Sequence, residues 1–266
     1  MFKNILVRDV HPTIFEISMQ FLKYLKSISA VLLLVCVANI GNTAVTITIN
    51  DVEYNYTNTP RLADVLAPIA LKEPWYWPAS RLYRINQYQY EIEQKRAEIL
   101  GMIEQIKLDA TVQMHTSLDT LAIHITGWQL AQPIPIPIDY DQARLKPSTN
   151  PSFESGNYIL NLVTRNQSLH LSGLINKEAT IAAPIQCSGT FFNHITKLNF
   201  ASKDFVYVIQ PTGKIKKLGI AYWNRECRSL MPGSQIIVPI HEPLFFSIFR
   251  KLNEAVVQLA TYRIIK

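Results

Sequence analysis

"VTITINDVEYNYT", residues 45–57, predicts how the first half of the chain folds. Apolar and polar residues alternate on both sides of an Asn-Asp pair, which is typical of a tight turn. Because strand side chains alternate between two faces, this period of two indicates a β-hairpin. The next segment, residues 59–71, predicts a short helix with Thr59 as its N-cap and Pro60 at its first position. Together they open a mixed α+β unit.

A helical hairpin is predicted next, at about residues 80–122. Apolar residues recur at spacings of three, four and seven residues, which indicates one long amphipathic helix beginning near Ser80; they are Ile85, Tyr88, Ile92, Ile99, Ile103 and Ile106. A second helical segment is expected from about Asp109 to Leu121. We interpret the pair as a hairpin inserted in the first domain.

The segment "ITGWQLAQPIPIPID", residues 125–139, carries three prolines that alternate with isoleucines. Proline has no N–H to donate to a sheet, so the segment is predicted to be an edge strand with its even-numbered isoleucines turned inward. Missing donors also hinder the pairing of another chain along that edge.

A second domain is predicted after the Pro- and Ser-rich stretch at residues 146–157. Its pattern is two strands, a short helix, a hairpin and a last strand, and an amphipathic helix follows. We therefore expect an α+β protein with two β-grasp domains. The predicted parts are an N-terminal extension with a signal peptide at residues 1–44, the first domain at 45–147, the second at 156–240 and the terminal helix at 243–264.

The N-terminal region predicts export. From Met19, two lysines precede an apolar run that ends at Ile40, and small residues lead to a cleavage site after Ala44. The apolar run is shorter than a membrane-spanning helix usually needs. We expect a secretory signal peptide starting at Met19; a lipoprotein signal ending at Cys36 is the alternative.

The cysteines left after cleavage are Cys187 and Cys227. An even pair in an exported protein is expected to form a disulfide. Two unpaired buried thiols are the alternative.

Composition argues against several function classes. The formal net charge is +6, but the basic residues do not form the stripe that nucleic-acid binding needs. The six histidines show no spacing suited to a metal, and no nucleophile elbow or phosphate-binding glycine loop is present. Asp139 and Asp141 suit acid–base chemistry on a glycoside, although such pairs usually cap helices or face water. We expect no catalytic residue, metal or cofactor, and no nucleic acid.

Several motifs in order resemble one known family. They are "YWP" at 76–78, "ITG" at 125–127, "IPIDYDQAR" at 136–144, "SGNYIL" at 155–160, "VYVIQPTG" at 206–213, "AYWN" at 221–224 and "PGSQIIVP" at 232–239. The set, spanning about residues 45–262, is similar to the GfcC-like family of capsule-biosynthesis proteins. The last motif also resembles the closing strand of soluble-ligand-binding β-grasp (SLBB) domains in Wza-type polysaccharide export channels.

This resemblance implies a periplasmic protein of a Gram-negative bacterium without catalytic activity. It implies an accessory role in the biosynthesis or export of capsule or O-antigen polysaccharide. The expected partners are that polysaccharide, an outer-membrane polysaccharide export protein, or both. An enzyme that modifies or cleaves the polysaccharide and a purely structural adaptor are the alternatives.

One position departs from the family. Relatives carry an arginine in a cleft directly after the Ile-Thr-Gly motif, where this chain has Trp128. An indole offers a stacking face for a less acidic sugar, or else it fills the core. The residues predicted to bind a ligand are Trp75, Trp77, Arg81, Arg84, Trp128 and Trp223; alternatively, Trp77 and Trp223 fill the two domain cores.

The apolar face of the terminal helix leaves three interpretations open. It packs on its own domains, it docks to a partner or to a second copy, or it lies on a membrane surface.

Overall fold

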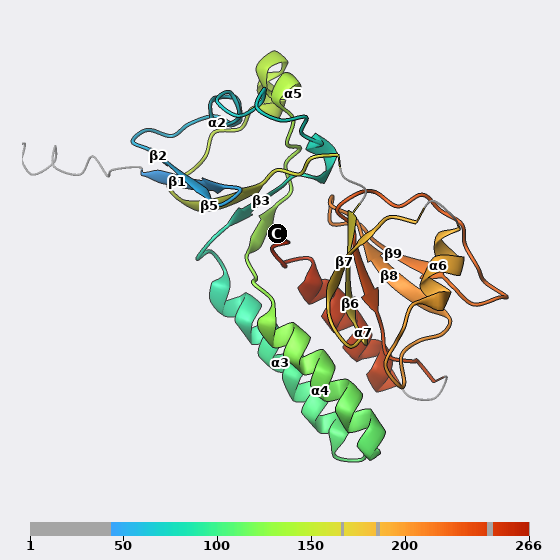
Figure 1. Ribbon diagram of the computed structural model, residues 1–266. Coiled ribbons are helices and arrows are strands. Elements are labelled where there is room, and N and C mark those ends of the chain that lie inside the picture. The colour runs from blue at the N-terminus through green and yellow to red at the C-terminus, as the bar shows by residue number, and fades with distance from the viewer. Residues whose placement is uncertain (1–43, 166–167, 185–186, 244–246, 266) are drawn as a thin grey trace, which may run out of the picture. The chain divides into compact units, whose positions relative to one another are not determined.

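The computed structural model describes residues 44–165, 168–184, 187–243 and 247–265. The predicted N-terminal extension and all but the last residue of the predicted signal peptide lie outside these ranges. The described chain is a mixed α+β protein with two five-stranded sheets (Figure 1).

The first sheet has the strand order β2-β1-β5-β3-β4. Its central strands β1 and β5 run parallel, with Val45 opposite Gly156 and Ile49 opposite Leu160, and the other neighbours are antiparallel. The strands are β1 (Val45–Ile49), β2 (Val52–Tyr56), β3 (Arg81–Arg84), β4 (Gln132–Ile134) and β5 (Gly156–Asn161).

The second sheet has the order β7-β6-β10-β8-β9. Its parallel pair is β6 with β10, again the first and last strands of the unit. The two sheets therefore share one topology when each is counted along its own segment. The strands are β6 (Ser168–Gly173), β7 (Ala179–Ala182), β8 (Phe205–Ile209), β9 (Ile215–Gly219) and β10 (Gln235–Val238).

The strand at residues 156–161 was expected to open the second domain, and this assignment is wrong. It is β5, which lies between β1 and β3 and completes the first sheet. The alternating burial along β5 would suit a strand of either sheet. Only its pairing partners show that β5 belongs to the first sheet.

The first hairpin is confirmed. Asn50 and Asp51 have φ angles of 45° and 69°, which are the two left-handed residues of a tight turn that matches the twist of a hairpin. The Asn50 amide also exchanges two hydrogen bonds with the backbone of Leu162, at 2.8 and 3.0 Å. The turn is thereby fastened to the chain that follows β5.

Two predicted helix starts are wrong. Helix α2 (Leu62–Leu66) begins after Arg61, whose backbone N–H bonds to Asp64, so Thr59 is not its cap and Pro60 lies before the helix. Helix α3 (Gln89–Lys107) begins nine residues after Ser80, because β3 occupies the intervening positions and Tyr88 has a φ of 54°.

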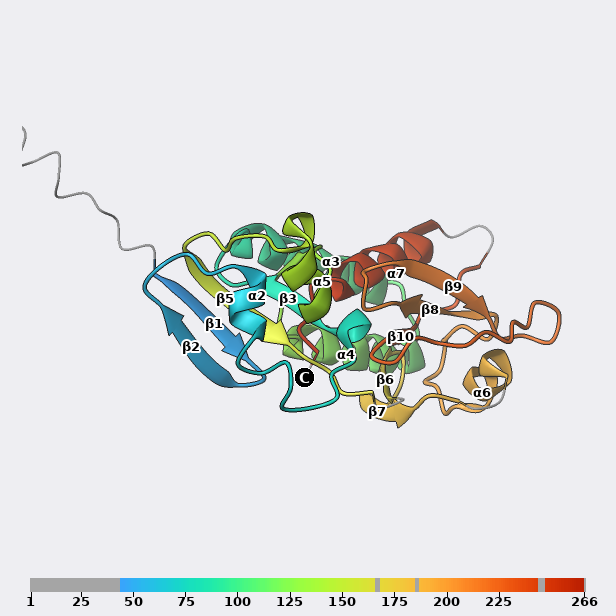
Figure 2. The same cartoon turned by 90° about the horizontal axis from the view of Figure 1, so that it is seen from above.

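The other helices are α4 (Val112–Gly127), α5 (Tyr140–Leu145), α6 (Ser188–His194) and α7 (Ser247–Ala260). Short 3₁₀ helices occur at η1 (Trp77–Ala79) and η2 (Pro147–Thr149). Helices α3 and α4 form the predicted hairpin, and α7 lies beside α3 (Figures 1 and 2).

Two hydrophobic cores support these elements. One joins the first sheet to α2 and α5, with Ile47, Leu62 and Leu66 fully buried. The other joins the second sheet to the α3–α4 hairpin, α6 and α7. The hairpin is inserted in the first sheet between β3 and β4, yet its buried isoleucines belong to the second core.

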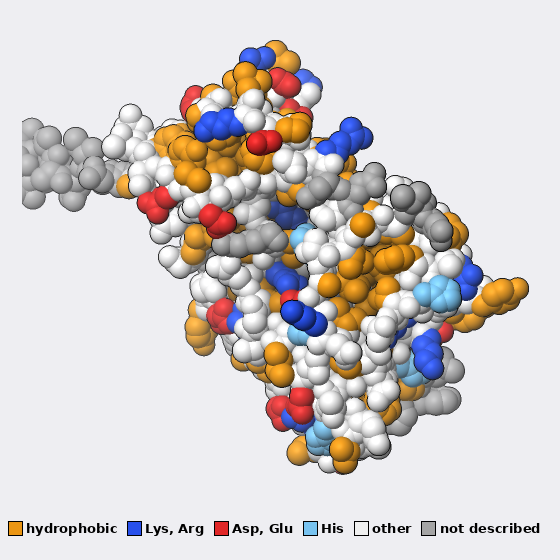
Figure 3. All heavy atoms as spheres, in the orientation of Figure 1, with side chains coloured by type: hydrophobic (Ala, Val, Ile, Leu, Met, Phe, Trp, Pro, Cys, Tyr) orange, Lys and Arg blue, Asp and Glu red, His pale blue; other side chains and the backbone are white. Residues whose placement is uncertain are grey.

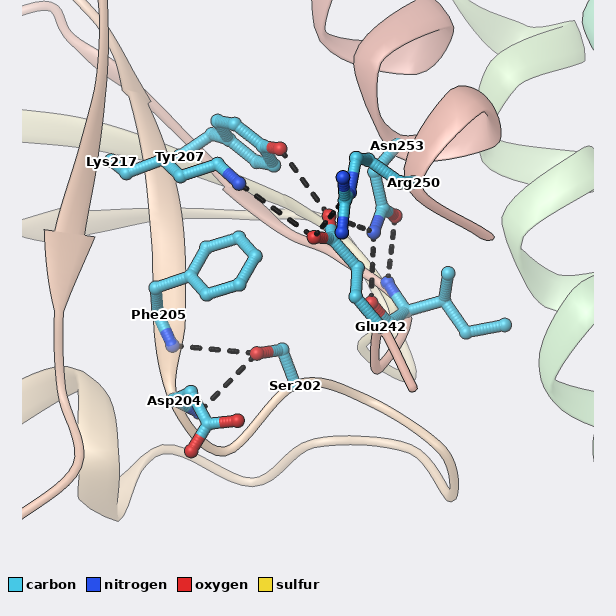
Figure 4. A network of polar contacts seen from close by, with 9 residues as sticks. Ser202, Asp204, Phe205, Tyr207, Lys217, Glu242, Arg250 and Asn253 are labelled. Atoms are coloured by element: carbon cyan, nitrogen blue, oxygen red, sulfur yellow. Dashed lines mark hydrogen bonds and ion pairs between the residues drawn. The ribbon is translucent and has the colours of Figure 1, made fainter. Parts of the chain in front are cut away.

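Helix α7 packs within its own chain. Leu252, Val256 and Leu259 are buried in the second core. The amide of Asn253 both accepts from and donates to the backbone of Ile240 at 2.9 Å, and it donates to Glu242 (Figure 4). The apolar face of this helix is therefore occupied by the protein itself, as the first of the three interpretations expects.

Cys187 and Cys227 form a disulfide. It joins the start of α6 to the loop between β9 and β10, which holds Tyr222 and Trp223. Within the described ranges, no helix is both long and apolar enough to cross a membrane.

Candidate functional site

A cavity of about 760 Å³ follows the proline-rich segment at residues 132–139. We call it the proline groove. Its other walls are η1, the start of β3, the β8–β9 turn at residues 211–213 and the last turns of α7.

The edge strand explains why the groove has this form. Strand β4 pairs with β3 on one side, and Ile138 is buried while Pro135 and Pro137 are exposed. The expected edge strand is thus confirmed at residues 132–134, and Ile138 is turned inward as predicted, whereas residues 125–127 of the segment belong to α4. Prolines with fixed backbones give the groove a rigid apolar wall, and the half-buried Trp77 also lines it.

Polar groups border this apolar wall. Gln132 and Gln258 bring amides, and Thr212 and Thr261 bring hydroxyls, from opposite sides of the groove. Ser80 is also a lining residue, and its buried hydroxyl has no hydrogen-bond partner within the described ranges. A largely apolar cavity with a few polar groups is the usual composition of a small-molecule or sugar site.

Arg81 lies between the proline groove and a second cavity. Its guanidinium donates to the Gln210 carbonyl oxygen at 2.8 Å and to the Tyr83 hydroxyl at 3.5 Å, so β3 is linked to the end of β8. The second cavity, of about 410 Å³, adjoins a smaller one of about 170 Å³, and both are lined by His170 and Thr180. We call this pair the His170 hollow. Figure 3 shows Lys or Arg side chains and His side chains gathered on the face between the first sheet and β7.

His170 is held uncharged. Burial lowers its pKa to about 4, the positive charges of Arg263 and Arg81 add to this, and Glu178 opposes it. Its Nδ1 lies 3.3 Å from the Thr180 hydroxyl. Arg263 and Arg81 therefore both act on the ring of His170.

Acidification is expected to destabilise the protein through His170. The unfolded chain binds the proton near pH 6.5 and the folded chain only near pH 4, so stability is complete above pH 6.5 and declines as the pH falls between these values. Because the ring is only partly buried, we expect a loss of about 1–2 kcal/mol. Urea unfolding at pH 7 and pH 4.5 checks this: the wild type should lose that much more than His170→Gln, and equal losses would contradict it.

Of the predicted ligand residues, Trp77 and Arg81 meet at the proline groove. Trp128 does not: it is 3% exposed, and its indole N–H donates to Glu178 at 2.8 Å. Glu178 in turn holds both guanidinium nitrogens of Arg263, which lies over the Trp128 ring. Trp128 is thus a core residue at the end of α4, the second of the two interpretations.

The remaining members of the predicted set are dispersed. Arg84 pairs with Glu154 at 2.6 Å and lines neither cavity. Trp75 borders the His170 hollow but donates its indole N–H to Ile69. Trp223 is 75% exposed in the β9–β10 loop, so it does not fill a core.

The two aspartates of the enzymatic alternative have separate structural contacts. Asp139 caps α5 by accepting from the Gln142 N–H at 2.9 Å. Asp141 lies 3.7 Å from Arg144 and does not line the proline groove. The described part of the chain holds no cluster of three His, Cys, Asp or Glu suited to a metal.

Sequence reasoning missed His170, Gln258 and Thr261 as cavity residues. A lone histidine in a strand and polar residues on a helix carry no motif. The repeated prolines were the available signal, because a segment that cannot pair leaves an open edge for a ligand.

Comparison with known proteins shows what the chain resembles. Residues 189–265, which include all but the first residue of α6 together with β8–β10 and α7, match the family model described as capsule biosynthesis GfcC C-terminal. The resemblance to the GfcC-like family is confirmed. The chain is also 24% identical over 209 residues to the uncharacterized protein YjbG of Escherichia coli strain K12, which covers 78% of this chain and 84% of that protein. The matched residues include the β8–β9 turn and the α7 residues that line the proline groove.

Proposed function

We propose that this protein is a periplasmic, non-catalytic accessory protein in the biosynthesis or export of capsule or O-antigen polysaccharide, and that it binds the polymer in the proline groove. The observation that carries the proposal is the meeting of Trp77 and Arg81 at an open groove with a rigid apolar wall. Such a wall packs against the C–H faces of sugar rings, while the amides and hydroxyls opposite bond to sugar hydroxyls. The match to a capsule-biosynthesis family model supports the substrate class.

The strand orders support β-grasp domains of the SLBB type. Each sheet has its first and last strands paired in parallel at the centre and its second strand at one edge. This is the arrangement expected for a β-grasp unit, and it occurs twice. The motif at residues 232–239 resembles the closing strand of export-channel domains, and on this ground we propose an outer-membrane polysaccharide export protein as the second partner.

Export to the periplasm rests on the signal-peptide pattern from Met19 to Ala44. The Cys187–Cys227 disulfide supports it, since such bonds persist in oxidising compartments.

A second candidate function is that of an adaptor which docks to another envelope protein. Tyr222 and Trp223 are 92% and 75% exposed at neighbouring positions of one loop. Exposed Tyr and Trp are enriched at interaction hot spots. Loss of partner capture in Trp223→Ala, with polymer binding unchanged, would favour this candidate.

Trp77→Ala is expected to weaken binding of oligosaccharides released from the host capsule about tenfold. Losing an aromatic face that a sugar ring covers removes about 1.4 kcal/mol or more of apolar contact. Isothermal titration calorimetry measures the effect, and Trp223→Ala is the matched control because its indole lies outside the groove.

Trp77 also packs against the first core, so its loss affects stability. Gln258→Ala therefore provides an independent test, since Gln258 is exposed on α7 at the opposite wall. We expect it to weaken binding several-fold without changing the circular dichroism spectrum. Unchanged affinity in both variants would refute binding in the groove.

A further inference from the structure

Arg81 has hydrogen-bonding capacity that the protein does not use. A guanidinium has five N–H donors, and its contacts within the described chain are those to the Gln210 carbonyl and the Tyr83 hydroxyl. No carboxylate of the described residues forms an ion pair with it. Both the proline groove and the His170 hollow include Arg81 in their walls. A ligand in either cavity therefore meets a partly desolvated cation.

Among the basic residues that line the hollow, Arg81 is the one that is charged and has no carboxylate partner within the described chain. Arg263 is neutralised by two bonds to Glu178. His170 is uncharged at neutral pH, because its pKa is about 4. Asp51, in the β1–β2 turn, is the acidic residue in the wall of the larger cavity. It is not among the charged residues that shift the pKa of His170, which are Arg263, Arg81 and Glu178.

The geometry around Arg81 also favours a planar anion. The side chain is half-buried and fixed by its bond across to Gln210, so little rotamer entropy remains to be lost on binding. A guanidinium fork matches a carboxylate in two parallel hydrogen bonds. The larger cavity, of about 410 Å³, lies within the range of ligand pockets.

We propose that the His170 hollow is a subsite for an acidic sugar residue, whose carboxylate binds Arg81 while neighbouring sugars of the same polymer lie in the proline groove. The inference rests on the proposed function and deepens it, since it makes the substrate an acidic polysaccharide. The positively charged residue that binds the carboxylate is then Arg81 of β3, because Trp128 is buried and carries no charge.

The test compares host capsular oligosaccharides in their native and carboxyl-reduced forms. The reduced form keeps the sugar sequence and loses only the negative charge. Calorimetry is expected to show at least tenfold tighter binding of the native form. Arg81→Gln should bring the two affinities together, whereas Trp77→Ala should weaken both by a similar factor. Arg144→Gln, which removes the same charge from an exposed site on α5, should preserve the preference.

A measurement on the wild type covers the case in which Arg81→Gln disturbs the fold. NMR titration of His170, assigned with His170→Gln, should show a higher pKa in the presence of the native oligosaccharide, because a carboxylate beside the ring stabilises its protonated form. The reduced form should leave the pKa unchanged. Equal binding of the two forms, or an unchanged His170 pKa at saturation, overturns the inference and leaves groove binding intact. Absence of binding by either form overturns the proposed function as well.

Discussion

Gly173→Ala is expected to lower the free energy of unfolding by about 4 kcal/mol. Gly173 ends β6 with a φ of 95°, where an alanine is strained by about 1 kcal/mol or more. The larger part of the loss comes from crowding. A Cβ at this position would overlap with the backbone oxygen and nitrogen of Val238 on β10, and neither atom can move without breaking the parallel pairing of the two strands.

Gly213→Ala is the matched control for this substitution. Gly213 also has a positive φ, of 83°, but no atom lies within 4 Å of the position its Cβ would take. Its replacement should therefore cost only the backbone strain, about 1 kcal/mol. Urea unfolding of both variants separates the two contributions, and equal losses would show that β6 and β10 do not approach as closely as described.

The consequence of Gly173→Ala extends beyond the second sheet. The Gly173 carbonyl oxygen accepts a hydrogen bond from His124 Nδ1 of α4 at 3.1 Å. The residue is thus a junction between β6, β10 and the helical hairpin. The hairpin residues in turn belong to the core that supports α7 and its end of the proline groove.

Local patterns predicted most elements of this fold. The alternation around Asn50 predicted the first hairpin, and the apolar spacing between Ile85 and Ile106 predicted the long helix of the helical hairpin. These features depend on neighbours in the sequence, which a single sequence displays.

Pairing between distant segments could not be predicted in the same way. The alternation in β5 shows that it is a strand but not that it pairs with β1, more than one hundred residues earlier. The start of α3 was misplaced for a related reason. Leu82 and Tyr83 are both buried, on opposite faces of β3, so their apolar pattern reads as a continuation of the helix.

The candidate site could be predicted only in part, because it too depends on contacts between residues far apart in the sequence. Trp77 and Arg81 were predicted from composition, and the fold brings both to one groove. Whether Trp128 binds a ligand or fills the core depended on Glu178, fifty residues away, which accepts its indole N–H. His170 carries no sequence signal, because its properties arise from Arg81, Arg263 and burial rather than from its neighbours in the chain.

Asn253→Ala is expected to cost about 3 kcal/mol of folding free energy. Asn253 is 4% exposed on α7, and its amide satisfies both the N–H and the carbonyl of Ile240. Alanine would leave these two buried groups without partners. It would also remove a donor from Glu242, whose side chain is 11% exposed (Figure 4).

Glu242 makes the loss larger than that of an ordinary side-chain hydrogen bond. Its carboxylate lies 2.9 Å from the Asn253 amide, while Lys217 and Arg250 are farther away, at 3.7 and 3.8 Å. Burial, and next the negative charge of Glu242, raises the pKa of Tyr207. The tyrosine therefore stays protonated as a second donor to Glu242, at 3.5 Å. Removing the Asn253 amide leaves a desolvated carboxylate with only these weaker contacts, and such a group is costly.

Glu254→Ala provides the control, since the neighbouring residue is exposed on the same helix and its loss should change stability by no more than about 0.5 kcal/mol. Chemical unfolding of both variants, with α7 followed by hydrogen exchange at Val256 and Val257, distinguishes local from global loss. A loss below about 1 kcal/mol in Asn253→Ala would mean that α7 is held by its apolar contacts alone. In that case, release of α7 to a partner would cost the protein only those contacts. The predicted loss instead makes α7 a fixed wall of the proline groove, because a helix held by a buried amide and a buried carboxylate does not leave its sheet at low cost.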